Sequence, residues 1–250
     1  MRFRDIPLLK RLIPSARKRI AAITWPGGFK IVRRHGVLLL LDYRNYVDRE
    51  LLFYGRYERD QLDTLTAAML RHGCDIFLDV GANIGLYSLI VATRRLAGRV
   101  IAFEPDARSL GALQANLLIN HLADNVEVRP IALSDHDGAV RFTPDPGTSS
   151  CRSRVSADGS LSVSCAKLDA LLPTSGKRLF CKIDVEGHEL SVVDGMRHVL
   201  EHNRCFLQIE SFAANLPALD KVLHKVGYRQ RHQIDHDHYY DNFSSDIPPC

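Results

Sequence analysis

Apolar runs alternate with amphipathic stretches along most of the chain, and their spacing predicts the order of its elements. Continuous apolar runs predict strands at residues 76–80, 100–103, 126–131, 179–185 and 205–209. Apolar positions at helical spacing predict helices at residues 62–72, 86–97, 110–118, 168–172, 190–200 and 216–226. Because the strands are largely apolar rather than alternating, we expect an α/β fold with a mostly parallel sheet that helices cover on both faces.

Hairpins flank this alternating core. Residues 29–32 and 37–41 read as a strand pair, and residues 228–233 and 238–243 read as a closing hairpin that adds an antiparallel edge to the sheet. Residues 140–166 are rich in Ser, Gly, Pro and Asp, which predicts a small hairpin or loop region. We expect its irregular part, 144–164, to cover a ligand pocket, since long irregular loops in compact domains tend to carry function.

Charge is distributed unevenly along the 250 residues. Residues 1–35 hold ten Lys or Arg and a single acid, Asp5, whereas the remaining 215 residues hold 23 basic and 28 acidic side chains. We therefore divide the chain into a basic arm (1–35), a lead-in that packs on the core (36–73) and an α/β domain (74–250). An acidic body is a poor general binder of nucleic acid, so the arm is the one evident docking surface for anions.

The start of the arm supports two interpretations. Residues 2–23 mix basic and aliphatic side chains, and Pro7 and Pro14 break them into short pieces. Residues 1–23 could thus contact anionic lipid or a lipid-linked substrate as a peripheral membrane segment. Alternatively, they could form a solvated basic leader, and we favour this second interpretation slightly. The longest purely aliphatic run, residues 37–41, is far shorter than the roughly 20 residues that span a bilayer.

The cysteines and the first residues bear on the cell compartment. The six cysteines form no C-x-x-C pair, so we expect reduced thiols in a cytoplasmic protein, with peripheral contact at the inner membrane surface as an option. Charges interrupt the first 20 residues before an apolar core can form, which argues against a secretory signal. An organellar transit peptide stays open as a minor alternative.

A glycine-rich turn opens the first strand–helix unit of the core. Gly81 and Gly85 follow a predicted strand, Asp79 precedes them, and Glu104 ends the next strand, where an acid can accept both hydrogen bonds of a ribose diol. A dinucleotide would place its pyrophosphate near Asp79, which would repel it, and Asn83 replaces the central glycine of G-x-G-x-x-G. The ammonium and sulfonium groups of S-adenosylmethionine suit this acid. A turn without a ligand would leave both acids unexplained.

Several linked motifs resemble the FkbM-type methyltransferases over about residues 50–212. They are LDVGANIGLYSL, AFEPDARSLGALQANLLIN, ALSDHDG, KLDALL and KIDVEGHELSVVDGM. The resemblance implies a class I Rossmann-like fold with seven strands, S-adenosyl-L-methionine as methyl donor, and O-methylation of sugars, glycolipids or polyketide-type products. It also implies cofactor contacts: the methionine end at Asp79, Gly81, Asn83 and Gly85, the ribose at Glu104, and the adenine near Ser134 and Asp135.

Candidate catalytic groups cluster at the end of the fourth core strand. Lys182, Asp184 and Glu186 share one face of the strand, where charges are costly unless they are paired or face a cleft. Asp184, His188 or Glu210 could accept the proton of an acceptor hydroxyl. Lys182 could orient a carboxylate, or it could form a purely structural ion pair with Glu210. His188 could equally touch only solvent.

Weaker signals concern the substrate and metals. Tyr57 and Glu58 could form one wall of the acceptor pocket, with Ser149 and Glu186 on the other sides. The acids and His188 at the fourth strand lack a recognisable metal-ligand spacing, and a solvated turn explains the histidines of HQIDHDHYYD, so we predict no metal site.

The sequence therefore predicts an S-adenosylmethionine-dependent O-methyltransferase that acts on a small-molecule or glycan acceptor, most plausibly a sugar hydroxyl in a glycan, glycolipid or natural product. One alternative is an enzyme that methylates RNA or another macromolecule and uses the basic arm as a phosphate clamp, although the arm lacks interleaved aromatic residues. Another is a non-catalytic member of the fold that docks on a membrane or a partner.

Overall fold

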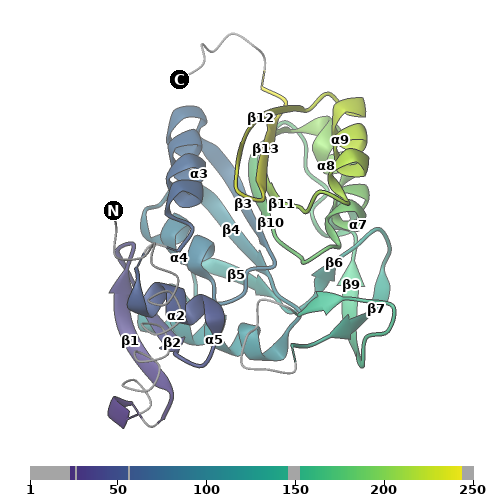
Figure 1. Ribbon diagram of the computed structural model, residues 1–250. Helices are drawn as coiled ribbons and strands as arrows, with labels where there is room; N and C mark the ends of the chain where they lie inside the picture. The colour runs from purple at the N-terminus through teal and green to yellow at the C-terminus, as the bar shows by residue number, and fades with distance from the viewer. Residues whose placement is uncertain (1–22, 26, 56, 146–152, 244–250) are drawn as a thin grey trace, which may run out of the picture.

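The computed structural model describes residues 23–25, 27–55, 57–145 and 153–243, and its centre is a seven-stranded sheet in the order β12-β13-β11-β10-β3-β4-β5 (Figure 1). The strands are β3 (Cys74–Val80), β4 (Ala97–Phe103), β5 (Val126–Arg129), β10 (Arg178–Ile183), β11 (Arg204–Glu210), β12 (Arg229–Ile234) and β13 (Asp237–Asp241). Strands β11, β10, β3, β4 and β5 are parallel, and β13 runs antiparallel to both of its neighbours. The predicted sheet is confirmed, with β12 as its edge strand.

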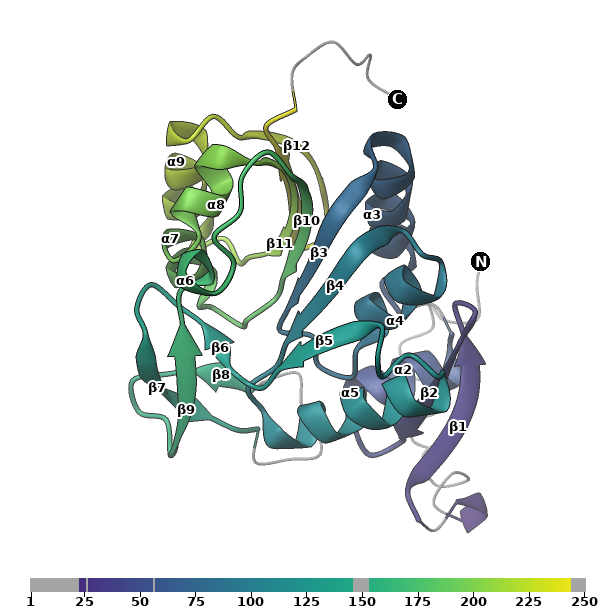
Figure 2. The same ribbon diagram turned by 180° about the vertical axis from the view of Figure 1, so that it is seen from behind.

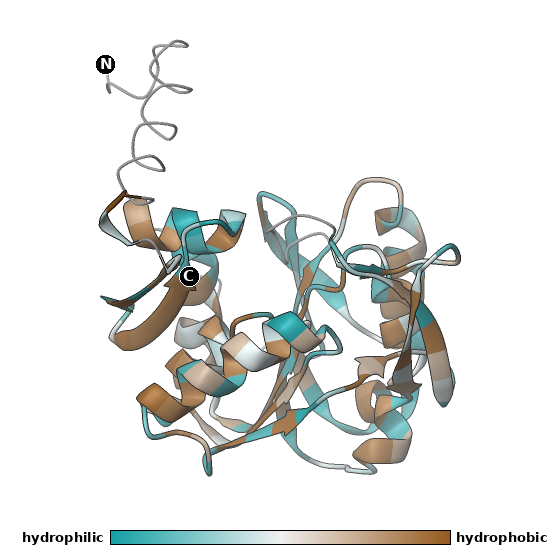
Figure 3. Cartoon of the chain, turned by 90° about the horizontal axis from the view of Figure 1, so that it is seen from below, coloured by the Kyte–Doolittle hydropathy of each residue, from teal (hydrophilic) through white to brown (hydrophobic). Residues whose placement is uncertain are grey.

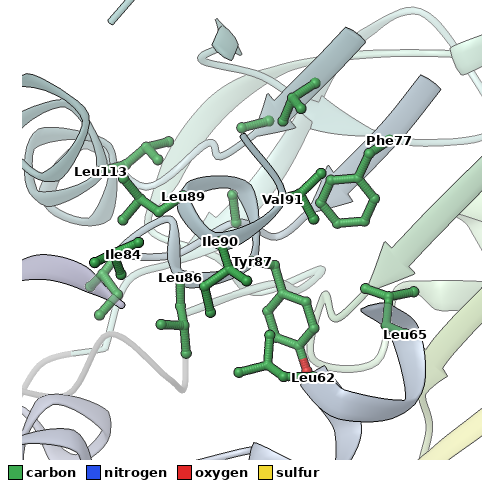
Figure 4. Packing of buried hydrophobic residues seen from close by; sticks show 14 of the residues in the cluster. Leu62, Leu65, Phe77, Ile84, Leu86, Tyr87, Leu89, Ile90, Val91 and Leu113 are labelled. Carbon is green, nitrogen blue, oxygen red and sulfur yellow. The ribbon is translucent and has the colours of Figure 1, made fainter. Parts of the chain in front are cut away.

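Helices cover both faces of the sheet (Figures 1 and 2). One face carries α3 (Arg59–His72), α4 (Leu86–Thr93) and α5 (Ala107–Ile119). The other carries α6 (Leu168–Leu171), α7 (Glu189–Asp194), α8 (Arg197–His202) and α9 (Leu216–Lys225). Strand alternation divides the core accordingly, because Phe77 packs toward α4 while its neighbours Ile76 and Leu78 pack toward the opposite layer. Figure 4 shows the first layer, where Leu89 and Val91 of α4 lie between Phe77 and Leu113.

A hairpin and a short helix extend the first layer. Strands β1 (Phe29–Arg34) and β2 (Val37–Asp42) pair antiparallel, as predicted, and α2 (Tyr46–Phe53) follows. The side chains of Asn116 and Asn120 on α5 accept hydrogen bonds from the β2 backbone at 2.7 and 2.8 Å, which fixes the hairpin on the domain. The boundary that we placed after residue 35 falls in the hairpin turn. Residues 1–22 of the basic arm lie outside the described residues.

The predicted hairpin or loop region is a second, four-stranded sheet. It consists of β6 (Ala132–Leu133), β7 (Gly138–Thr143), β8 (Arg154–Val155) and β9 (Leu161–Ala166), in the order β6-β9-β7-β8. The strand expected at 126–131 ends at Arg129, and the chain then enters this second sheet. Part of the expected irregular loop, 144–164, is therefore strand, while residues 146–152 lie outside the described ranges.

The single helix predicted at 190–200 is two helices, α7 and α8, with a break at Gly195 and Met196. A Cβ atom on Gly195 would lie 1.9 Å from the carbonyl oxygen of Ser134, so the chain bends where the two backbones touch. Helical spacing of apolar residues continues across the break, which explains why the pattern alone predicted one helix.

Candidate functional site

A cavity of about 680 Å³ opens at the carboxyl ends of the central parallel strands. Its walls come from α2, the turn after β3, the end of β4, the second sheet and the segment after β10. Figure 3 views the molecule from this side. In open parallel sheets, this edge is where ligands bind. The predicted site residues that line the cavity are Tyr57, Gly81, Asn83, Glu104, Asp184, Glu186, His188 and Glu210.

The glycine-rich turn forms the floor of the cavity. Gly81 has a φ of +78°, and a Cβ atom there would lie 1.9 Å from the carbonyl oxygen of Asp184. Gly85 has a φ of +84°, its Cβ would lie 2.2 Å from the tip of the Leu113 side chain, and it does not line the cavity. Positive φ thus favours glycine at both positions, and contact with the backbone requires it at Gly81. Asn83, two residues after Gly81, has a φ of +49° and lines the cavity.

Glu104 is buried beside this turn at the end of β4. Its two carboxylate oxygens accept backbone hydrogen bonds from Asn83 at 2.7 Å and from Asp106 at 2.8 Å. Burial raises the pKa of Glu104 to about 7, although those two hydrogen bonds oppose the shift. The carboxylate is therefore held rigidly at the cavity wall with lone pairs left to accept hydroxyl groups.

Asp79 does not line the cavity. It is buried behind the glycine turn, where Oδ2 accepts hydrogen bonds from the Ser88 backbone at 3.0 Å and the Ser88 hydroxyl at 2.6 Å. Its Oδ1 atom has no hydrogen-bond partner within the described residues. Burial raises the pKa of Asp79. The structure thus places Asp79 behind the turn, where it fixes the start of α4 and does not reach the cavity wall.

Ser134 is also buried outside the cavity. It forms a hydrogen bond with His188, although the sequence analysis gave the two residues separate roles. Its hydroxyl lies 3.0 Å from Nε2 of His188 and 3.1 Å from Oδ1 of Asp135. Asp135 is exposed and pairs with His136 at 2.7 Å. His188 lines the cavity and is half-buried, so it does not touch solvent alone. Burial lowers its pKa, which favours the neutral imidazole.

Lys182 and Asp184 form the charged pair beneath the cavity. The buried Nζ atom lies 2.8 Å from Oδ2 of Asp184 and 5.1 Å from the centre of the Tyr87 ring. Burial opposes the charged ammonium, but the carboxylates of Asp184, Glu58 and Asp79 outweigh it and raise the pKa of Lys182. The direct partner of Lys182 is therefore Asp184, not Glu210 as one of our alternatives had it.

Acidic side chains also line the cavity after β10 and at the end of β11. Burial and the charge of Asp184 raise the pKa of Glu186 to about 7 and also raise that of Glu210. Glu58, at the start of α3, does not line this cavity, and burial raises its pKa too, against the attraction of Lys182. Glu186 and Glu210 hold protons near neutral pH and can thus both donate and accept hydrogen bonds. Tyr57 also lines the cavity. Ser149 lies outside the described residues.

Several lining residues were not predicted. Arg49 comes from α2 and Arg154 from β8. Ser153 also lines the cavity, where its hydroxyl accepts a hydrogen bond from the Asp145 backbone and donates one to the Asp106 carboxylate, each at 3.0 Å. No local motif marks these positions, since tertiary packing brings them to the cavity. Within the described ranges, no group of His, Cys, Asp and Glu side chains is arranged to hold a metal ion. Among the helices described, none is long and apolar enough to cross a bilayer.

Comparisons with known proteins agree with this geometry. A family model described as methyltransferase FkbM domain matches residues 79–230. Hexuronic acid methyltransferase AglP of Haloferax volcanii is 33% identical over 129 residues, which are 51% of this chain and 52% of AglP. The 31-O-demethyl-FK506 methyltransferase FkbM of Streptomyces tacrolimicus is 38% identical over 79 residues, 30% of each chain. The chain thus spans about half or less of the length of these relatives.

A solved structure supports the fold over nearly the whole chain. The human methyltransferase 10 domain containing protein superposes with a TM-score of 0.50 at 13% identity, covering 96% of this chain and 97% of the other. At that identity the likeness concerns the fold alone. It agrees with the seven-stranded sheet described above and with the class I methyltransferase fold that the sequence predicted.

Proposed function

Since this chain belongs to the FkbM domain family of methyltransferases, as the sequence motifs predicted, we propose that it is an S-adenosyl-L-methionine-dependent O-methyltransferase whose acceptor is a sugar hydroxyl. One observation carries the proposal. The glycine turn with Glu104 and the polar groups Asp184, Glu186 and His188 line the same cavity, so a donor and an acceptor can meet there. A glycan, a glycolipid or a natural product could carry such a hydroxyl.

The cofactor side of the cavity fits S-adenosylmethionine in its chemistry. Glu104 offers carboxylate oxygens at the end of β4, where they can accept both hydroxyls of a ribose. The backbone of Gly81 lines the cavity without a side chain, so the methionine portion can approach the main chain of the turn. Asp184 lines the cavity near this turn, where a carboxylate would repel a pyrophosphate but attract an ammonium or sulfonium.

The acceptor side favours a molecule with many hydroxyl groups. Glu186 and Glu210 can donate and accept hydrogen bonds at neutral pH, and Tyr57 adds a phenol. Sugars present such alternating donors and acceptors. The relation to a hexuronic acid methyltransferase in Haloferax volcanii supports a sugar as the acceptor.

The chemistry asks little of the protein beyond alignment and proton removal. When bound, S-adenosylmethionine supplies a methyl group that is already activated for in-line displacement. The pair of Lys182 and Asp184 holds the floor of the cavity in a fixed arrangement. His188 presents a mainly neutral imidazole and accepts the proton of the attacking hydroxyl as the new carbon–oxygen bond forms.

Two measurements test the proposal. Calorimetry should show that Glu104→Ala weakens S-adenosylmethionine binding by roughly 1–3 kcal/mol, because charge-assisted hydrogen bonds are lost. The matched control Glu201→Ala, on the exposed surface of α8, should leave the affinity unchanged. If folded Glu104→Ala binds S-adenosylmethionine as tightly as the wild type and the control do, the cofactor assignment is wrong.

The acceptor requires an incubation of the purified protein with methyl-labelled S-adenosylmethionine and fractionated host extract. We expect label in a glycan or glycolipid fraction, and its loss in His188→Gln. Label in RNA or protein would overturn the acceptor class while keeping the cofactor. Cofactor binding with no label in any fraction would favour a docking protein instead.

A further inference from the structure

One face of β1 exposes large apolar side chains. Phe29 and Ile31 alternate with less exposed residues along the strand, and they are 54% and 53% exposed. Because side chains alternate across a strand, both lie on the same face of the hairpin, where Phe29 also borders a groove with Leu40 of β2 and Ala112 of α5. Single exposed hydrophobic residues are ordinary, but neighbours on one face of a strand form a patch.

Cationic side chains surround this patch. Arg33 lies on the same exposed face of β1, and Lys30 lies 3.9 Å from the centre of the Trp25 ring. The guanidinium of Arg44 lies 5.3 Å from the centre of the Phe29 ring, and it is also paired with the carboxylate of Asp42 at 2.7 Å, which offsets part of its charge.

The patch connects to the cavity through contacts between side chains. Arg49 donates a hydrogen bond to the Arg44 carbonyl at 2.8 Å and lies 5.8 Å from the centre of the Tyr46 ring. Tyr46 is 51% exposed, and both Tyr46 and Arg49 line the cavity. The basic and aromatic surface therefore runs from β1 to the mouth of the site. In Figure 1, β1, β2 and α2 lie together beside the carboxyl ends of the central strands.

We propose that this surface, formed by Phe29, Ile31, Tyr46, Arg33 and Arg44 and called here the hairpin face, docks on an anionic lipid bilayer and holds the mouth of the cavity at the membrane. Apolar side chains among cations are the composition of interfacial membrane contacts, because the apolar groups enter the headgroup boundary while the cations pair with lipid phosphates. A nucleic acid would satisfy the cations but would leave Ile31 exposed. Docking does not depend on which acceptor the cavity takes.

Flotation of the full-length chain with lipid vesicles tests the proposal. We expect binding to phosphatidylcholine vesicles that contain phosphatidylglycerol and little binding to phosphatidylcholine alone, with loss in high salt. The double substitution Phe29→Ser and Ile31→Ser should lower the bound fraction about fivefold or more. Lys30→Glu with Arg33→Glu should do the same.

The matched control replaces exposed leucines elsewhere, Leu70→Ser on α3 and Leu161→Ser on β9, which are 74% and 51% exposed. The control should float like the wild type, and all variants should keep the wild-type melting temperature and affinity for S-adenosylmethionine. Flotation that is equal in the wild type and the Phe29/Ile31 variant would overturn the proposal, since another segment would then carry the binding. A wild-type dimer that this variant dissociates would assign the face to a second copy, and RNA binding without flotation would assign it to nucleic acid.

Discussion

Gly81 and Asp184 touch through their backbones at the point where β3 and β10 end side by side. The carbonyl oxygen of Asp184 occupies the position that a side chain on Gly81 would need, because a Cβ atom added to Gly81 would lie 1.9 Å from that oxygen. This contact joins the cofactor turn to the strand end that carries Asp184 and Glu186. The distance between the two halves of the site is therefore set by main-chain packing.

Gly81→Ala should consequently damage both stability and cofactor binding. The substitution adds a clash and a positive φ that alanine disfavours, so we expect a loss of about 2 kcal/mol or more in the free energy of unfolding. Urea unfolding and calorimetry with S-adenosylmethionine measure the two effects. Gly111→Ala is the control, because its Cβ would meet nothing within 4 Å in α5, and it should gain about 0.5–1 kcal/mol. Equal effects at both glycines would contradict the packing argument.

The pair of Lys182 and Asp184 predicts a rescue experiment. Asp184→Ala removes the direct partner of a buried ammonium and should cost about 3 kcal/mol of stability. The loss should not be larger, since Glu58 and Asp79 still attract the ammonium. Adding Lys182→Met should restore most of that stability, because no buried charge is then left unpaired. Methyl transfer should stay low in both. A double variant as unstable as Asp184→Ala would show that the pair is not the source of the loss.

The hydrogen bond between Ser134 and His188 predicts a separation of binding from catalysis. Ser134→Ala should lower kcat about tenfold and shift the acidic limb of the pH profile, because the imidazole loses its orienting partner. In the wild type that limb should lie below pH 6.5, since burial lowers the pKa of His188. The affinity for S-adenosylmethionine should not change. If Ser134 instead contacts the adenine, as the family resemblance implies, the affinity will fall while kcat and its pH profile stay unchanged.

Asp48 on α2 predicts how stability depends on pH. Burial raises its pKa to about 7 from the ordinary value of 3.8, so the folded state favours the protonated acid, and its contribution to stability is lost as pH rises from about 4 to 7. Asp48→Asn removes this titration. We expect the variant to be about 2–4 kcal/mol more stable than the wild type at pH 8 and nearly equal to it at pH 4. Urea unfolding at both pH values measures this, with the exposed Asp60→Asn as control. A difference that does not vary with pH would contradict the argument.

Sequence reasoning pointed to the edge of the sheet that holds the proposed cofactor residues, because those residues are close together in the chain. The glycine turn and Glu104 lie within 24 residues of each other, and one strand–helix–strand unit brings them together. Residues whose roles depend on long-range packing were harder to place. Asp79 has the right residue type and position in the motif, but its side chain turns into the layer below to bind Ser88. Spacing cannot reveal which way such a side chain points.

The wall of the cavity shows the same limit. The hydrogen bond between Ser134 and His188 joins residues 54 positions apart, and the break between α7 and α8 lies where Gly195 meets the backbone of the same Ser134. Arg49 and Arg154 reach the cavity from α2 and from the second sheet, and neither position has a sequence signal of its own.

Ser134 is held at three atoms. Its amide bonds the Ala166 carbonyl at 3.0 Å, its hydroxyl bonds His188, and its carbonyl abuts Gly195. The four-stranded sheet is thereby anchored to the segment that carries His188, while its far strands, β7 and β8, extend from that anchor. Insertions and deletions in those far strands can reshape one wall of the cavity without moving the glycine turn, so one scaffold can diversify on that wall while the rest of the site stays constant.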